Sequence, residues 1–319
     1  MARVRDVVLA VVSKGEEVPA VAIAARSAGE LDRELAYPAE LRVSVLADEA
    51  LILGAFGRLS TEQAPPRTVA RRGSGGPPVW VGPGTIHVTL SLANPGALVP
   101  CDEKRIVNRY VRALLRAITT HSKTQAHFFG RDWVSLAHQP VAWVGFGHDA
   151  SSKRTLFEAF VAVRRPFAPA DHASFLGREP TTLEALSGRH IDPRALAESI
   201  AEAYGRGAQI VLLPDADGVT GSLACEASRV DDLPWQATRQ EAIGVVGAGR
   251  DSQGVFRVGG DLLVSRDSLA RLEARVAGSP RLSADDIGRI VDETLAAPGV
   301  ALDGVRSLAS IRDIIAEAL

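Results

Sequence analysis

The sequence is poor in lysine, cysteine, methionine and aromatic residues. Its 319 residues include 2 cysteines, 1 methionine and only 5% aromatic side chains. Among the 36 lysines and arginines the lysines are Lys14, Lys104, Lys123 and Lys153, and all the others are arginine. Cys101 and Cys225 form neither a metal-ligand spacing nor a disulfide framework, so we expect no metal site and a reduced, cytoplasmic location.

Long hydrophobic runs and a large charge of one sign are also absent. The opening MARVRDVVLAVV has an apolar run too short for a signal peptide, and no stretch approaches the roughly 20 residues of a membrane span. The formal net charge of -2 gives no reason to expect a nucleic-acid or membrane partner. Hydrophobic and charged contents of 46% and 23% are ordinary for a globular protein of one large domain with an appendage, or of two domains.

Hydrophobic periodicity predicts a mixed α/β chain. Residues 41–57 indicate two strands around Asp48 and Glu49, and 79–92 indicate another pair. Residues 101–121 change to helical spacing, with Asp102 as the expected N-cap. Three further strands are expected in 131–163, and a second helix follows Asp192, with proline at its first position.

The C-terminal part has its own pattern. From about Trp235 the glycine-rich segment AIGVVGAGRDSQGVFRVGGDLLVS predicts a small sheet. Two helices and a closing helix, LASIRDIIAEAL, are expected after it. We therefore expect a larger domain over residues 1–238 and a small α/β accessory domain over residues 239–319.

The segment RRGSGGPPVWVGPGT, residues 71–85, combines backbone freedom with positive charge. Glycines let backbone N–H groups approach a ligand closely, and successive N–H groups can bind an anion. Arg71 and Arg72 could add charge-assisted contacts to a phosphate or a carboxylate. A Gly-Ser-Gly turn with solvated arginines explains this segment equally well.

The neighbours of this segment favour the ligand-binding interpretation. RRGSGGPPVWVGPGTIHVTL resembles the signature of the biotin/lipoate protein ligase superfamily, in its lipoate–protein ligase A branch. LILGAFGRLS, VNRYVRALLRAI, GRDWVSL and TLFEAFVAVRRPF are similar to the strands and the helix around that signature. The C-terminal segment resembles the accessory domain of the family. The resemblance implies a mixed α+β sheet domain of the ligase type followed by a small α/β domain.

The resemblance also implies an activity and a site. Members use ATP and Mg²⁺ to convert a carboxylate such as lipoate into an acyl-adenylate, and then transfer the acyl group to a lysine of a small carrier domain. On this chain Arg71, Arg72 and Ser74 with the Gly75 and Gly76 backbone would hold the activated acyl group. The resemblance further places Val79 and Trp80 in the apolar wall for the acyl chain, and Gly145 on the glycine of the family's Lys-x-x-Gly strand.

The sequence departs from the family pattern at chemically important positions. The catalytic lysine position is occupied by Ala142, and Lys153 is the nearest lysine and a weak substitute for it. Pro77 and Pro78 replace residues with donor N–H groups, and Glu158 stands where a histidine is usual. A cation is needed near the reacting phosphate, so these changes put the activation step in doubt.

No other residue supplies an obvious catalyst. The sister octanoyltransferases use a cysteine that would fall near residues 176–177, where this chain has none, and Cys225 lies well downstream. His148 and Asp149 are either an acid/base pair or a solvated hairpin tip.

Two interpretations therefore remain. The first is a divergent lipoate ligase-like enzyme that transfers a lipoyl- or octanoyl-type group. The second is a catalytically inactive family member that binds a ligand, a lipoyl-type carrier domain or a ligase partner.

Overall fold

A single mixed sheet of eight strands forms the centre of the larger domain. The computed structural model describes residues 7–58, 68–167, 177–214, 233–279 and 281–319. The strands lie in the order β11 (Gln209–Leu212), β1 (Val8–Val18), β2 (Ala39–Leu46), β6 (Ile86–Leu92), β10 (Thr155–Val161), β9 (Gln139–His148), β8 (Trp133–Leu136) and β7 (Ala126–Phe128). β1 is parallel to both of its neighbours, and all the other pairs are antiparallel. The predicted mixed α+β sheet is confirmed.

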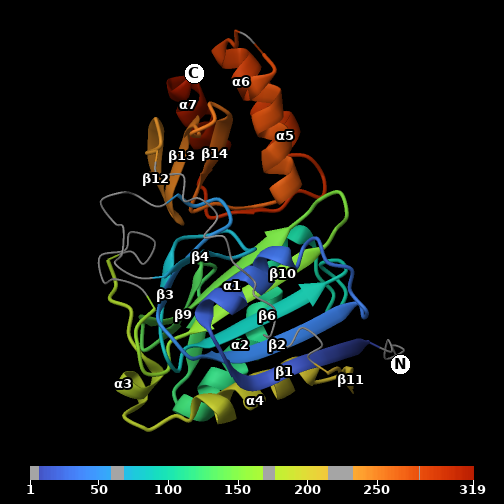
Figure 1. Cartoon of the computed structure of the whole chain (residues 1–319), viewed down its shortest axis with the longest axis vertical. Helices are drawn as coiled ribbons and strands as arrows, with labels where there is room; N and C mark the ends of the chain where they lie inside the picture. The colour runs from blue at the N-terminus through green and yellow to red at the C-terminus, as the bar shows by residue number, and fades with distance from the viewer. Residues whose placement is uncertain (1–6, 59–67, 168–176, 215–232, 280) are drawn as a thin grey trace.

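Two helices cover one face of this sheet. α2 (Ile106–Ser122) and α4 (Pro193–Gly205) pack against each other and against the strands, and α3 (Leu183–Ser187) lies beside α2 (Figure 1). Asp192 accepts the N–H of Arg194 and caps α4 as predicted. Asp102 occupies the N-cap position of a short 3₁₀ turn (Glu103–Arg105) that leads directly into α2, but its side chain makes no capping hydrogen bond, and the residue before α2 itself is Arg105.

The other face is covered by α1 (Ala20–Gly29) and by a small sheet. That sheet has the order β4 (Val69–Arg71), β3 (Ala50–Leu53) and β5 (Val79–Val81). Since both faces of the large sheet are covered, every residue of β2, β6 and β10 is buried. The helix-covered face is apolar, with Phe146 and Phe157 among its aliphatic side chains. The face toward α1 carries buried polar side chains: Glu40, Arg42, Ser44, His87, Thr89, Ser91 and Glu158.

The C-terminal module is a three-stranded sheet with helices. β12 (Ala237–Glu241), β13 (Gly244–Arg250) and β14 (Phe256–Gly260) are antiparallel, as the glycine-rich segment predicted. β15 (Leu263–Val264) pairs with β16 (Leu302–Asp303). α7 (Leu308–Ala318) packs on β12 and β13, α5 (Arg266–Ala277) packs on β14, and α6 (Ala284–Leu295) packs against both helices. The predicted helices are thus confirmed.

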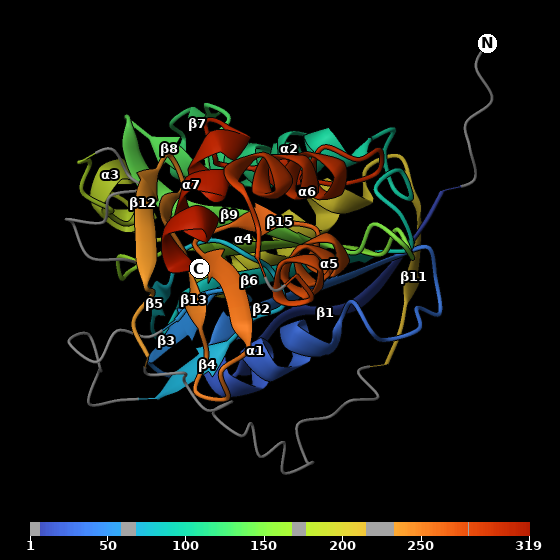
Figure 2. The ribbon, with the colours of Figure 1, turned by 90° about the horizontal axis from the view of Figure 1, so that it is seen from above.

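This module lies over one end of the large sheet, where Figure 2 shows α5, α6 and α7 above the strands. Arg266 forms two hydrogen bonds with Asp32, at 2.9 and 2.7 Å, and Asp267 accepts the N–H of Ala150 at 2.8 Å. His148 Nε2 lies 3.2 Å from the Gly299 carbonyl. The contacts between the two parts are therefore polar as well as apolar.

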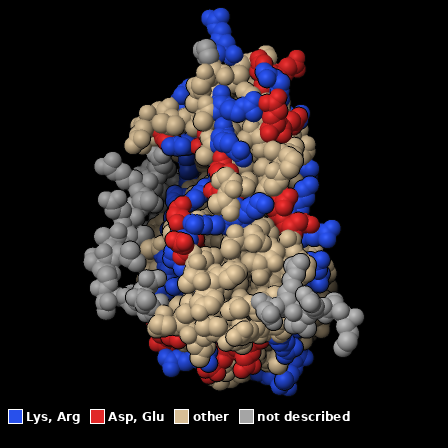
Figure 3. Space-filling model, turned by 90° about the vertical axis from the view of Figure 1, so that its right-hand side faces the viewer, with Lys and Arg blue, Asp and Glu red and all other residues tan. Residues whose placement is uncertain are grey.

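Charged side chains of both signs are interspersed on the surface. On the face in Figure 3 they gather over the upper part, which belongs to the C-terminal module, and an uncharged area occupies much of the lower part. Within the described residues no helix is both long and apolar enough to cross a membrane.

Candidate functional site

The glycine-arginine loop, residues 72–78 between β4 and β5, lies flat on β9. The N–H of Gly75 donates to the Phe146 carbonyl at 3.1 Å. A Cβ atom on Gly147 would lie 2.8 Å from the Gly73 carbonyl oxygen, so only glycine permits this approach of loop and strand. The loop and the glycines of β9 therefore fit together backbone to backbone.

Arg72 is buried beneath this loop, with 1% of its surface exposed. Its guanidinium donates four hydrogen bonds: to Ser74 Oγ at 3.0 Å and to the carbonyls of Ile52 at 3.0 Å, Gly75 at 2.8 Å and Pro77 at 2.8 Å. Burial lowers the pKa of Arg72 to about 10, which leaves it charged at neutral pH. In this structure Arg72 shapes the loop from inside, and its predicted contact with an acyl-phosphate stays a prediction.

Arg71 also binds backbone carbonyls. Its Nη1 lies 2.9 Å from the Gly54 carbonyl and 2.7 Å from the Gly57 carbonyl. These contacts fix the turn after β3 to the end of β4, and the side chain remains half-buried. The predicted contact of Arg71 with a ligand likewise stays a prediction.

A buried polar chain continues from Arg72 into the sheet. Ser74 donates a short hydrogen bond to Glu158, and the other oxygen of Glu158 lies 2.6 Å from His87 Nε2. Burial acts to raise the pKa of Glu158, but the hydrogen bond with His87 and the charges of His87 and Arg72 outweigh burial and lower the pKa. Glu158 is thus an anionic counterpart to Arg72, a role that sequence reasoning missed.

Trp143 fills the space between the loop and β9. Its indole ring is fully buried and lies 3.9 Å from the Arg72 guanidinium carbon, a cation–π contact. The same ring would be 2.8 Å from a Cβ on Gly76 and 2.4 Å from one on Gly145. Sequence reasoning missed Trp143, although it directly follows Ala142.

The side chain of Ala142 points away from this arrangement. Successive residues of a strand face opposite sides of the sheet, so Ala142 lies among the aliphatic residues beneath α2, whereas Trp143 and Gly145 face the loop. A lysine at position 142 on this strand would enter the helix-covered core. The side chain that this part of β9 turns toward the loop, beside Gly145, is the indole of Trp143.

The C-terminal module closes the loop from the other side. The N–H of Gly76 donates to the Leu262 carbonyl at 2.9 Å, and a Cβ on Gly75 would lie 2.0 Å from the same oxygen. Gly260 donates to the Phe56 carbonyl at 2.8 Å, next to the end of β3. The loop is therefore held between β9 and the module, with both of its predicted donor N–H groups bonded within the protein.

Val79 and Trp80 form the strand that leaves the loop. Val79 is buried in an apolar cluster with Trp143, whereas Trp80 on the opposite side is half-buried. The predicted acyl-chain wall thus consists of one residue facing the core and one facing outward. This expectation stays a prediction.

Two buried carboxyl groups lie near the contact between the large sheet and the C-terminal module. Asp132 is 2% exposed and neither of its oxygens bonds to another residue, so burial raises its pKa to about 8. Burial also raises the pKa of Asp261 to about 7, although it accepts the N–H of Val245 at 2.8 Å. A cavity of about 180 Å³ beside Asp132 is lined in part by Arg131 and Asp303. Asp132 belongs to the segment GRDWVSL, which resembles one of the strands around the ligase signature.

The other candidates lie apart from the loop. Lys153 is exposed in the turn between β9 and β10, with a φ of 63°. His148 contacts Thr155 at 3.0 Å and the Gly299 carbonyl, whereas Asp149 accepts hydrogen bonds from Ser151 and Ser152. No hydrogen bond joins His148 to Asp149 in the described residues. Cys225 lies outside the described residues.

The described residues also offer no evident metal centre. Within them, no group of three or more histidine, cysteine, aspartate or glutamate side chains is arranged to hold a metal ion. Cys101 donates to the Asp102 carbonyl at 3.1 Å, and burial raises the pKa of its thiol to about 11, which keeps it protonated. It is therefore a poor nucleophile.

Comparison with solved structures shows which known proteins share this fold. No family model and no curated protein matches the sequence. The structure of LipL1 from P. falciparum in complex with lipoate superposes with a TM-score of 0.62 at 12% identity, over 97% of this chain and 98% of that chain. Lipoate-protein ligase A bound with ATP gives 0.47 at 13% identity over 64% and 87%. Biotin protein ligase from Aquifex aeolicus gives 0.36 at 10% identity over 62% and 67%.

The class of protein is thereby defined. The chain is a mixed α+β protein with the fold of the lipoate and biotin ligases, as the loop resemblance implied. Its likeness to LipL1 extends over both the large sheet and the C-terminal module. This likeness shows the fold, and the activity has to be argued from the site.

Proposed function

We propose that this chain is a lipoate ligase-like protein that binds a lipoyl-type carrier domain or a ligase partner without activating an acyl group itself. The observation that carries the proposal is Trp143, whose indole fills the space beneath the glycine-arginine loop and stacks on Arg72. A ligand chain beside the loop would have to displace this fully buried ring.

The polar groups of the loop support the same proposal. A nucleotide phosphate needs free backbone N–H groups or free cations, and here Gly75 and Gly76 donate to Phe146 and Leu262. Arg72 is bonded to the carbonyls of the loop itself. In this arrangement the loop does not fit the phosphates of ATP.

The charge near the loop also opposes acyl activation. Formation of an acyl-adenylate brings two anionic groups together, and a cation has to stabilise the charge that develops. On the loop side of β9 the chain has Trp143 and Gly145, and Glu158 of β10 adds a negative charge beneath the loop. Lys153 is exposed in a turn.

A second candidate function is acyl–protein ligation with lipoate, octanoate or a related acid. One specific observation favours it: the chain keeps the double arginine and the glycine pair of the loop, and Arg72, Gly75 and Gly76 are buried beside the C-terminal module. LipL1, which shares the fold over nearly the whole chain, was crystallised with lipoate. In this candidate function a movement of the C-terminal module would release the N–H of Gly76.

One experiment separates the two functions. The protein is incubated with MgATP, lipoate and a lipoyl-type carrier domain, and the intact mass of the carrier is measured beside a known lipoate ligase. We expect binding of the carrier in a calorimetric titration and no lipoyl addition to it. Addition of a lipoyl mass by this chain would overturn the proposal in favour of ligation, and absence of both binding and modification would refute ligation and the binding of a carrier domain.

A further inference from the structure

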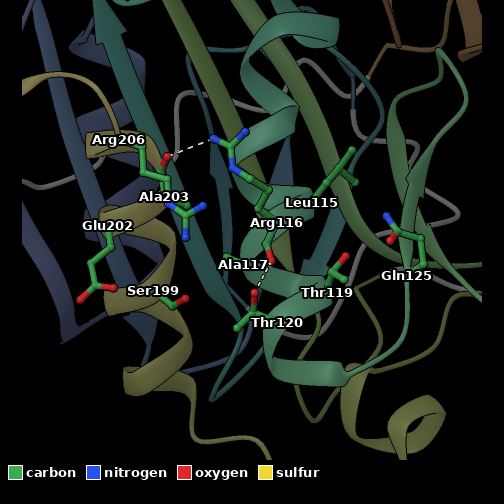
Figure 4. A pocket seen from close by; sticks show the side chains of 10 residues that line it. All are labelled: Leu115, Arg116, Ala117, Thr119, Thr120, Gln125, Ser199, Glu202, Ala203 and Arg206. Atoms are coloured by element: carbon green, nitrogen blue, oxygen red, sulfur yellow. Dashed lines mark hydrogen bonds between the residues drawn. The ribbon is translucent and has the colours of Figure 1, made fainter.

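A cleft between α2 and α4 lies on the face of the large sheet opposite the glycine-arginine loop. It consists of a cavity of about 380 Å³ and a neighbouring one of about 170 Å³, which share the residues Arg116, Ala203 and Arg206. Figure 4 shows the residues that line the larger cavity, with Arg116 and Thr120 of α2 on the side toward α4 and with Ser199, Ala203 and Arg206 on the α4 side. We call the two cavities together the arginine cleft.

Four arginines line this cleft: Arg109, Arg112, Arg116 and Arg206. The first three follow one another at intervals of three and four residues, so they lie on one side of α2. In the described part of the chain no carboxylate lies within salt-bridge distance of any of the four. Arg112 contacts only Asn108, at 3.4 Å, and Arg116 donates to the Ala203 carbonyl at 3.2 Å.

This arrangement is unusual for a chain with so many paired arginines. Elsewhere on the surface Arg239, Arg275 and Arg312 each bind a carboxylate. Guanidinium groups gathered without counter-charges repel one another, and an anionic partner relieves that repulsion. Glu202 is the one acidic residue among the cleft-lining residues, and it belongs only to the larger cavity.

The floor of the smaller cavity is apolar. Leu98, Val99, Ala113 and Tyr204 line it together with the arginines, and Val99 is 36% exposed. The floor is held firmly, because Tyr204 donates to the Tyr110 carbonyl at 2.8 Å and Tyr110 donates to the Pro95 carbonyl at 2.6 Å. The cleft thus combines a row of cations with a fixed apolar surface.

We propose that the arginine cleft binds an acidic segment of a partner protein in which carboxylate and aliphatic side chains alternate. Along α2 the three arginines are separated by about 4.5 and 6 Å of helix rise. Alternate side chains of an extended segment lie about 7 Å apart, within reach of these flexible side chains. In an extended segment alternate side chains share one side, so a row of carboxylates can face the row of arginines together. This inference does not rest on the proposed function.

A polypeptide fits the cleft better than a nucleic acid. Single-stranded nucleic acids bind by stacking bases on exposed aromatic rings, and the two tyrosines of the cleft are 2% and 5% exposed.

The test is a titration of the full-length protein with a fluorescent synthetic peptide in which glutamate and leucine alternate. The double variant Arg112→Glu/Arg116→Glu should weaken binding at least about tenfold, because two attractive contacts become repulsive. The matched control is Arg289→Glu/Arg239→Glu, which makes the same change of charge on the C-terminal module. It should leave the affinity within about twofold.

Two further arms make the outcome decisive. A peptide with glutamine in place of glutamate should bind at least about tenfold more weakly than the acidic peptide. Absence of binding by the acidic peptide, or equal binding by the wild type and the double variant with circular dichroism unchanged, would overturn the proposal. Tighter binding of an oligothymidylate that is lost in the same variant would assign the cleft to nucleic acid and overturn it as well.

Discussion

The pH dependence of stability tests whether burial keeps the carboxyl group of Asp132 protonated in the folded protein. The carboxyl group is 2% exposed, bonds to no other residue through its oxygens, and has a pKa raised by burial to about 8. Arg131 opposes this rise, whereas Asp261 and Asp303 reinforce it. We therefore expect Asp132 to be protonated in the folded protein at neutral pH.

The sign of the effect on stability follows from proton linkage. The unfolded chain loses this proton near pH 3.8, whereas the folded protein keeps it until about pH 8. Between these values the folded state binds more protons, so the free energy of unfolding falls as pH rises, by up to about 1.4 kcal/mol per pH unit. Over the two units from about pH 5 to 7 one such group accounts for about 3 kcal/mol.

Asp132→Asn removes this proton without changing the size of the side chain. The variant should show a shallower pH dependence than the wild type and should be the more stable of the two at pH 7. Urea unfolding at about pH 5, 6 and 7 measures both quantities, with the exposed Asp313→Asn as control. Parallel pH dependences of wild type and variant would refute the reasoning, because they would mean that Asp132 is ionised in the fold.

Three further predictions concern the loop and its support. Trp143→Ala should lower the free energy of unfolding by about 4 kcal/mol in urea titrations. Lipoate should raise the melting temperature of this variant but not that of the wild type; an equal rise in both proteins would contradict the argument that the indole fills the ligand space. Glu158→Gln should cost about 3 kcal/mol at neutral pH. Because the folded pKa of Glu158 is lowered, this cost should shrink progressively as the pH falls from about 4.5, the pKa in the unfolded chain, through the lower folded pKa; a cost independent of pH would count against the buried charge. At Gly76, where φ is 91°, a Cβ would lie 2.8 Å from the Trp143 ring, so Gly76→Ala should lower the free energy of unfolding by more than about 1 kcal/mol. At Gly57 the nearest atom to an added Cβ is 3.5 Å away, so Gly57→Ala should be nearly neutral. Equal losses in the two variants would refute the steric argument.

Local patterns were sufficient for most of the secondary structure. The strands of the hairpin β9–β10 and the C-terminal helices follow from alternation and from helical spacing. α1 was missed, because its cap comes from a distance: Asp48, in the turn after β2, accepts the N–H of Ala20 at 2.7 Å. A cap supplied by a residue far along the chain leaves no signal beside the helix.

The loop was recognised from its sequence, but its environment was not. The glycine N–H groups were expected to face a ligand, and their actual acceptors belong to Phe146 and Leu262, far along the chain. Likewise spacing alone did not reveal that Ala142 faces the helix-covered core, because the direction of a side chain depends on its place in the strand. Such long-range pairings are set by the tertiary structure and cannot be read from spacing alone.

The bond from the N–H of Gly76 to the Leu262 carbonyl has a consequence for dissecting the protein. A fragment ending before β12 would lack Leu262. The glycine-arginine loop would then be exposed to water on the face that the C-terminal module covers, and the N–H of Gly76 would lose the hydrogen-bond acceptor that it has within the described residues. Expressed separately, the two fragments should each have a lower melting temperature than the intact chain. When the fragments are mixed, the melting temperature should rise part of the way back. Limited digestion followed by calorimetry of the recombined fragments would reveal this mutual dependence.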